Sequence, residues 1–413
     1  MKRKQDQMLI VMCWVLYVSA YLGRYSYNTN LLPLSLYYGQ PQDQVALATT
    51  FFFFAYGAGQ IVNGILCKYF NTKYVLSIAV MISAAINLSV FMGIPFAYIK
   101  YLWLINGIVQ SVLWAGMMRA LSAHVSKESI GKAIVAMSTT SGAGTLLSYG
   151  LSALLAIWNG FRYSFLISAI CMGVTSVLWI VCYDRMTQGE LQEQEPKAQT
   201  GEQEKARAGK SRGGLVPTLV LFGAVAVIIN LVKDGLFSWV PTILYEKYTL
   251  APSLSIFVTL LLPVLGLFGT AFVINLHKKI ERHTLLMSVM FGLSAILVAA
   301  VTGLFATPYW YLVLAAFALL ALLMSGANNI VNSMMPLELR DRGNSGLIAG
   351  ILNGCCYVGS TFSQYGLALI AQNYGWDAMF YMFLVACAAV VAACMVAFLI
   401  ERFFRKKRAK EIA

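Results

Sequence analysis

Residues 184–214 read DRMTQGELQEQEPKAQTGEQEKARAGKSRGG, and this polar stretch divides an otherwise apolar chain of 413 residues into two parts. The stretch is rich in Glu, Gln, Lys and Gly and almost free of aliphatic side chains. Such a segment cannot bury enough apolar surface to offset the entropy that it would lose on ordering. We therefore predict one domain over residues 1–184, a cytoplasmic linker over 185–214 and a second domain over 215–413.

Long apolar runs lie on both sides of this linker, six in each part of the chain. Each run is long enough to cross a bilayer as a helix, which needs about 20 apolar residues. The runs cover residues 8–36, 46–66, 74–95, 99–123, 133–157, 163–183, 215–243, 253–276, 284–305, 308–335, 345–372 and 378–400. The sequence predicts an all-α integral membrane protein with twelve transmembrane helices in two six-helix halves.

The composition agrees with a membrane protein and excludes a water-soluble enzyme. Hydrophobic residues make up 59% of the chain, charged residues only 11%, and the mean hydropathy is +0.71. Soluble domains are about 45–50% apolar and about 25% charged. The eight cysteines include no Cys-x-x-Cys pair, so they indicate neither a disulfide framework nor a zinc site. We find no sequence motif for catalysis, and we expect a protein that is not an enzyme and that binds neither a metal nor a cofactor.

The net charge of +13 follows the membrane topology. Under the twelve-span arrangement, 25 of the 30 Lys and Arg residues lie on the side that holds both termini, whereas Lys100, Arg162 and Lys247 lie on the other. The positive-inside rule places the basic side in the cytoplasm. We predict a multi-pass protein of the plasma (bacterial inner) membrane with both termini cytoplasmic. Its surroundings are the lipid bilayer, no nucleic acid is bound, and the expected state is a monomer.

The two halves repeat a pattern of glycines. The segment HVSKESIGKAIVAMSTTSGAGTLLSYG (124–150) followed by WNGFRYSF (158–165) corresponds to LELRDRGNSGLIAGILNGCCYVGSTFSQYG (337–366) followed by YGWDAMF (374–380). The matched pairs are offset by 215 or 216 residues and are Gly131 with Gly346, Gly150 with Gly366 and Gly160 with Gly375. Two pseudo-symmetric halves related by an axis normal to the membrane are typical of the major facilitator fold, whose binding site lies near the midplane.

Three ionisable residues lie inside the predicted spans, Arg24 in the first and Lys233 with Asp234 in the seventh. A charge in lipid costs about 2.5–3.5 kcal/mol on insertion scales, so each should face the bundle interior or a water-filled cavity. Arg24 precedes Pro33 by nine residues and Lys233 precedes Pro241 by eight, which are equivalent places in the two halves. We predict that the two cations face a central cleft and bind an anion, with Arg24 offering a fork suited to phosphate or carboxylate.

Asp234 leaves two alternatives open. It could neutralise Lys233 in a structural pair while Arg24 snorkels or pairs elsewhere, or it could be a proton-coupling site. Adjacent residues on a helix point about 100° apart, so Lys233 and Asp234 cannot both point straight at the cleft axis.

Aromatic and amide residues are the remaining candidates for substrate contacts. Tyr17, Tyr21 and Arg24 fall at i, i+4 and i+7 on one helical face, which Tyr27 and Asn28 extend. These side chains fit either a cavity wall or ordinary packing. Polar residues of other spans could line the cavity or join helices, and they are Gln60, Gln110, Trp114, Asn328, Asn329, Asn332, Asn353 and Tyr357.

Several stretches carry a resemblance to a known family. They are AYLGRYSYNTNLLPLSLYYG (20–39), LVKDGLFSWVPTILYE (231–246), MPLELRDRGNSGLIAGILNGCCYVGSTFSQYG (335–366) and YGWDAMF (374–380). They resemble the organophosphate:phosphate antiporter family of the major facilitator superfamily, which includes glycerol-3-phosphate and hexose-phosphate antiporters. The resemblance covers nearly the whole chain outside the linker and the tails.

This resemblance implies rocker-switch alternating access, with phosphate held between an arginine of the first span and a basic residue of the seventh. Arg24 and Lys233 match these positions. Tyr17 and Tyr21 match a tyrosine stripe below the arginine, and Tyr357 matches a cavity tyrosine of the eleventh span.

The chain departs from the family pattern at several positions. Lys233 stands where better-known members have arginine, so a bidentate clamp becomes a point charge. Gln60, Ser141 and Ser325 stand in place of a lysine, a histidine and a tyrosine, and the loop GILCKYFNTK (64–73) has Lys68 and Tyr69 where the superfamily has Asp-Arg. A carboxylate or another organic anion therefore stays open beside a phosphorylated one.

We predict a secondary active transporter of a small organic anion, with a phosphorylated metabolite as the favoured substrate and inorganic phosphate or a proton as the coupling ion. One alternative is a proton-coupled carboxylate or sugar symporter. Another is a transporter-like membrane sensor of sugar phosphate, which would bind its ligand without net turnover. A multidrug exporter would favour acidic residues for cationic drugs, whereas these spans hold two cations and one acid.

Overall fold

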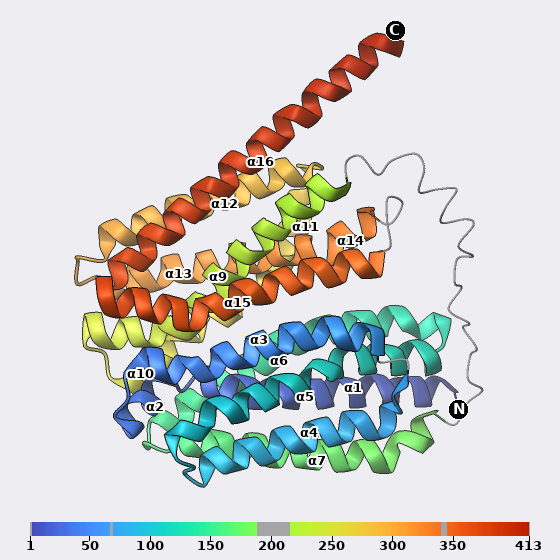
Figure 1. Cartoon of the computed structure of the whole chain (residues 1–413), viewed down its shortest axis with the longest axis vertical. Helices are drawn as coiled ribbons and strands as arrows, with labels where there is room; N and C mark the ends of the chain where they lie inside the picture. The colour runs from blue at the N-terminus through green and yellow to red at the C-terminus, as the bar shows by residue number, and fades with distance from the viewer. Residues whose placement is uncertain (1, 67–68, 188–214, 340–344, 413) are drawn as a thin grey trace. The chain divides into compact units, whose positions relative to one another are not determined.

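The structure is a computed structural model that describes residues 2–66, 69–187, 215–339 and 345–412 (Figure 1). Within these ranges the regular elements are helices, and each of the twelve predicted runs lies on one helix or on consecutive helices. Residues 188–214 of the predicted linker, and Lys68 of the loop discussed above, lie outside the described residues.

Seven helices precede the linker and the others follow it (Figure 1). The first group is α1 (Lys2–Asn28), α2 (Leu31–Tyr38), α3 (Gln42–Leu66), α4 (Thr72–Phe91), α5 (Phe96–His124), α6 (Lys127–Ala156) and α7 (Arg162–Thr187). The second group is α9 (Leu215–Tyr248), α10 (Pro252–Thr259), α11 (Leu261–His277), α12 (His283–Leu304), α13 (Trp310–Asn329), the π-helix η3 (Ile330–Met334), α14 (Met335–Glu338), α15 (Ser345–Tyr374) and α16 (Trp376–Ile412).

By length and composition, 10 helical segments among the described residues are apolar enough to cross a membrane. The two predicted spans outside this set are α6 and α15, each a helix of 30 residues. Their hydropathy is lower because they carry polar stretches such as STTSGAGT (138–145) and GSTFSQYG (359–366). Several of their polar side chains, including Thr140, Ser152, Ser363 and Gln364, are buried within the protein. Neighbouring helices therefore shield these polar side chains from the lipid.

The chain divides into two compact units. Unit 1 comprises Met1–Lys210 and Ser238–Leu260, and unit 2 comprises Ser211–Phe237 and Leu261–Ala413. The division falls inside α9, so the last part of α9 and α10 belong to unit 1, where α10 packs against α6. The domain limits predicted at 184 and 215 stay a prediction, because residues 188–214 between them lie outside the described residues.

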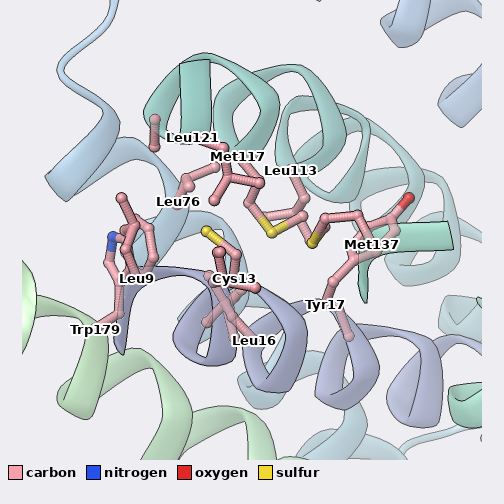
Figure 2. Close-up of a cluster of buried hydrophobic side chains, with 14 of the residues drawn as sticks. Leu9, Cys13, Leu16, Tyr17, Leu76, Leu113, Met117, Leu121, Met137 and Trp179 are labelled. Carbon is pink, nitrogen blue, oxygen red and sulfur yellow. The ribbon is translucent and has the colours of Figure 1, made fainter. Parts of the chain in front are cut away.

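The core of unit 1 fixes the first part of α1, which leads to the functional residues. α1 packs against α6 and α7, and α4 packs against α5 and α7. In Figure 2, Leu9, Cys13 and Leu16 of α1 point toward Met117 of α5 and Trp179 of α7, and all five are at most 1% exposed. The cluster continues into Tyr17, one turn before Tyr21.

Glycines set the spacing of one helix pair in each unit. A methyl group on Gly107 of α5 would collide with the backbone oxygen of Phe52 on α3. In unit 2, a methyl group on Gly326 of α13 would come within 2.7 Å of the backbone oxygen of Gly269 on α11. Small residues that let helix backbones approach closely are typical of helix packing in membranes. The second and fourth spans of each half are therefore joined in the same way.

Candidate functional site

Arg24 lies on α1 and is only 2% exposed. Its Nε donates a hydrogen bond to Oε1 of Gln110 on α5 at 3.0 Å. The guanidinium carbon lies 4.4 Å from the ring centroid of Tyr21 and 4.2 Å from that of Tyr56, with the Phe52 ring at 5.2 Å. Desolvated cation–π contacts contribute up to about 2 kcal/mol each. The guanidinium is thus held by an amide on one edge and by aromatic rings on α1 and α3.

The amide of Gln110 is fixed in turn by its own neighbours. Gln110 is fully buried, and its Nε2 donates to Ser83 Oγ at 2.7 Å and to Asn106 Oδ1 at 3.2 Å. Because these bonds use the donor end of the amide, the oxygen must face Arg24. The Nε–H of Arg24 is therefore engaged by the protein, and the fixed amide determines how the guanidinium plane is turned.

The tyrosine stripe predicted on the first span is one aromatic group in the structure. The Tyr17 and Tyr21 rings meet edge to face at a centroid distance of 5.0 Å, and Tyr17 lies 5.4 Å from Trp114 of α5. The Tyr17 and Tyr56 hydroxyl oxygens are 3.2 Å apart. Four side chains from three helices thus form a continuous wall beside Arg24.

Tyr27 and Asn28, the predicted extension of the stripe, have other neighbours. Tyr27 is fully buried, packs against Trp103 with a centroid distance of 4.7 Å and donates to the backbone oxygen of Val45 at 3.0 Å. Asn28 Nδ2 donates to Ser238 Oγ at 3.1 Å, which ties α1 to the part of α9 that belongs to unit 1. These contacts are structural, so the case for substrate contact is weaker here than at Tyr17 and Tyr21.

Three further candidates are half-buried. Gln60 lies on α3 one turn after Tyr56, Asn329 is the last residue of α13, and Tyr357 follows Cys356 on α15. Gln60 belongs to unit 1, whereas the other two belong to unit 2. Their role in substrate binding stays a prediction.

Lys233 and Asp234 form a partly buried ion pair on α9. Lys233 Nζ lies 3.4 Å from Asp234 Oδ1, with side-chain exposures of 16% and 8%. The ammonium also donates to Asn230 Oδ1 at 3.0 Å, and Ser360 of α15 donates to Asp234 Oδ2. The ion pair expected under the alternative in which Asp234 neutralises Lys233 is therefore present. An anion that binds to Lys233 would compete with this carboxylate.

An amide cluster continues from Lys233 to α13 and η3. Asn230 Nδ2 donates to Asn328 Oδ1 at 3.1 Å, and Asn332 Nδ2 donates to the same oxygen at 3.0 Å. Asn332 also donates to Cys356 Sγ at 3.3 Å. Each unit thus links its cation to an amide on the helix three spans further along the chain. Arg24 bonds directly to Gln110, whereas Lys233 is linked to Asn328 through Asn230.

The sequence alone did not single out some members of these clusters. Phe52, Tyr56, Asn230, Ser360 and Cys356 contact the charged residues or their amide partners. Asn230 could have been found, since it lies three residues before Lys233 on one helical face. The others lie on different helices, and their spacing in the chain gives no signal.

Among the described residues, no group of three or more His, Cys, Asp or Glu side chains could hold a metal ion. The chemistry on offer in each unit is a cation flanked by neutral hydrogen-bonding groups. Ionisable residues enclosed among spanning helices mark substrate and ion pathways. Helices of this length that enclose such groups define a polytopic membrane transport protein.

The chain belongs to the Major Facilitator Superfamily, whose description matches residues 13–364. Among solved structures, a bacterial homologue of the human lysosomal transporter Spinster is similar with a TM-score of 0.73, 15% identity and 97% of each chain covered. A D-xylose-proton symporter has a TM-score of 0.72 at 14% identity, covering 94% of this chain and 96% of that one. The predicted major facilitator fold is confirmed.

Sequence relatives cover most of the chain at low identity. A probable hexose phosphate transport protein of Chlamydia pneumoniae is 24% identical over 399 residues, which are 91% of this chain and 87% of that protein. Sugar phosphate exchanger 3 of Gallus gallus is 23% identical over 393 residues, with 83% and 76% covered. These relatives confirm the predicted resemblance to organophosphate transporters. Relatives and structural neighbours alike are transporters, which agrees with a protein that is not an enzyme.

Proposed function

We propose that this protein is a secondary active transporter of a phosphorylated sugar or a similar small organic phosphate, working by rocker-switch alternating access. The observation that carries the proposal is Arg24, a buried guanidinium held by Gln110 along one edge and by tyrosine rings on its faces. Guanidinium forks match phosphate oxygens in charge and spacing. The names of the sugar phosphate exchangers and hexose phosphate transport proteins among the relatives support the substrate class.

The proposed cycle uses both cations for one anion. Arg24 contributes a fork and Lys233 a point charge, while Asp234 offsets part of the charge when no substrate is bound. The anion is transported because it binds with different affinity in the open and occluded states, and only such a difference shifts their populations. Inorganic phosphate is the proposed counter-substrate.

The test is exchange in proteoliposomes. Vesicles that contain the purified protein and are loaded with inorganic phosphate should take up external radiolabelled glucose 6-phosphate, and vesicles without internal phosphate should take up far less. Ligand binding without turnover in either case would instead indicate a sensor. Uptake of neutral sugar, with no response to either phosphate, would contradict the proposal.

Proton coupling through Asp234 is a second candidate function. The observation in its favour is a buried carboxylate that accepts a hydrogen bond from Ser360 and lies 3.4 Å from the Lys233 ammonium. Under this mechanism, Asp234→Asn should abolish the acceleration of uptake by an inward proton gradient and leave exchange between equal internal and external substrate pools intact. Measured against wild type, an undiminished response to the gradient would remove Asp234 from proton coupling.

Gln110 provides a test of how the Arg24 fork is held. In Gln110→Glu a carboxylate would replace the amide that accepts from Arg24, form an internal ion pair and compete with the substrate anion. We expect the affinity for inorganic phosphate to fall about tenfold or more, because hydrogen bonds to charged groups contribute about 1.5–3 kcal/mol. Calorimetric titration of the purified protein measures this. An unchanged affinity in the folded variant would show that Gln110 lies outside the binding machinery.

The membrane setting is proposed from the charge pattern. The bilayer-spanning helices establish a multi-pass membrane protein, and the basic gaps favour cytoplasmic termini in a bacterial plasma membrane. We propose a monomer as the working unit, with each chain holding one Arg24 and one Lys233.

A further inference from the structure

A one-directional chain of hydrogen bonds leads away from Lys233. Lys233 Nζ donates to Asn230 Oδ1 at 3.0 Å, and Asn230 Nδ2 donates to Asn328 Oδ1 at 3.1 Å. Each amide thus receives a proton donor at its oxygen and passes a donor on from its nitrogen. Hydrogen bonds arranged in series polarise one another, so the ammonium charge strengthens the donors at the far end.

The orientation of both amides is determined by chemistry. A lysine ammonium has donors and no acceptor, so Asn230 must present its oxygen to Lys233. Its nitrogen is then the donor, and this nitrogen also finds the backbone oxygen of Ala226 at 3.0 Å. Asn328 must in turn present its oxygen to Asn230, and Asn332 donates to that same oxygen at 3.0 Å.

Asn328 is therefore an acceptor in the described contacts, and within the described residues its Nδ2 makes no hydrogen bond. The side chain is half-buried. The amide nitrogen carries two N–H donors. These donors end the chain that begins at the Lys233 ammonium, and they are the part of the cluster that a ligand could use.

We propose that Asn328 is a specificity-determining residue that donates a hydrogen bond to an oxygen of the substrate other than those bound by Lys233. This inference rests on the proposed transport of an organic phosphate and names the feature of the substrate that the second unit recognises. The amide of Asn230 lies between the two donors, which are the Lys233 ammonium and the Asn328 amide nitrogen. A ligand that reaches both needs an anionic group for Lys233 and a further oxygen acceptor on its carbon skeleton.

A sugar phosphate has this chemistry, because its hydroxyl oxygens lie beyond the phosphoryl group. Inorganic phosphate has all its oxygens on one atom and would engage Lys233 without reaching Asn328. The amide cluster should therefore raise the affinity for sugar phosphate and leave that for inorganic phosphate nearly unchanged. This difference separates the two substrates of the proposed exchange.

The experiment compares two ligands in variants of the full-length protein. Asn328→Asp keeps an oxygen for Asn230 and Asn332 but has no outward donor, and Asn328→Ala removes the donor without adding charge. Asn373→Ala is the matched control, since it removes an exposed amide of α15 that lies outside the cluster and donates to the backbone oxygen of Leu369. Equilibrium binding of glucose 6-phosphate and of inorganic phosphate is measured for each protein in detergent, together with its thermal unfolding midpoint.

We expect both Asn328 variants to lose glucose 6-phosphate affinity by about tenfold or more relative to inorganic phosphate, the effect of one hydrogen bond to a charged or strongly polarised partner. The Asn373 variant should keep the wild-type ratio of the two affinities. If aspartate acted only through its charge, Asn328→Asp would weaken the binding of glucose 6-phosphate and of inorganic phosphate by the same factor. The inference is overturned if both Asn328 variants lose the same factor of affinity for the two ligands, or lose none. If the wild-type protein binds neither ligand, the proposed function itself fails, which is a different result from an unchanged ratio.

Discussion

Replacement of Arg24 by alanine is expected to abolish exchange of sugar phosphate for inorganic phosphate. The variant loses the buried guanidinium, and hydrogen bonds to charged groups contribute about 1.5–3 kcal/mol each, to which the loss of its charge adds. We therefore expect phosphate affinity to fall about 100-fold or more, at 1.4 kcal/mol for each factor of ten. Titration of the purified variant with inorganic phosphate and uptake into proteoliposomes measure the two effects.

Arg162→Ala is the matched control for this experiment. Arg162 also packs on aromatic rings, at 5.4 Å from the Tyr37 centroid and 5.8 Å from that of Phe91, and it donates to the backbone oxygen of Phe91 at the end of α4. Its loss should lower the unfolding midpoint, because a terminal helix carbonyl loses its partner. Phosphate affinity should stay at the wild-type value. Wild-type transport by a folded Arg24→Ala protein would contradict the proposed role of Arg24.

Lys233→Ala is expected to lose both anion affinity and stability. The change leaves the buried Asp234 carboxylate without the cation that lies 3.4 Å away. Breaking a buried ion pair by removing one partner costs about 3–5 kcal/mol. Chemical or thermal unfolding in detergent should therefore show a marked loss of stability, in parallel with the loss of phosphate binding.

The double variant Lys233→Ala/Asp234→Asn separates these two effects. It removes the unpaired carboxylate as well, so most of the lost stability should return. Phosphate affinity should stay low, because no cation has been restored. Recovery of phosphate binding in the double variant would mean that Lys233 only neutralises Asp234 and does not hold the substrate.

The main features of the fold were readable from the sequence because they depend on local composition. Twelve apolar runs and a repeat of glycines predicted the helices, and charges as rare as Arg24 and Lys233 stand out inside such runs. The lower hydropathy of α6 and α15 was also present in the sequence. The reason for this lower hydropathy is visible only in the structure, where polar side chains such as Ser152 and Gln364 are buried within the protein.

The partners of the two cations could not be predicted in this way. Gln110 and Tyr56 meet Arg24 from α5 and α3, and Asn328 joins Lys233 through Asn230 from α13. Helical periodicity identifies which residues share a face, but not which face of another helix lies opposite. The direction of the amide chain follows from donor and acceptor chemistry only once these helices are placed.

We propose that Arg24 and Lys233 bind the same anion. The stoichiometry of inorganic phosphate binding to the purified protein and to each single variant tests this proposal. We predict one phosphate per chain in the wild type, and loss of that phosphate in Arg24→Ala and in Lys233→Ala alike. Two phosphates per chain, each lost in only one of the variants, would contradict the claim.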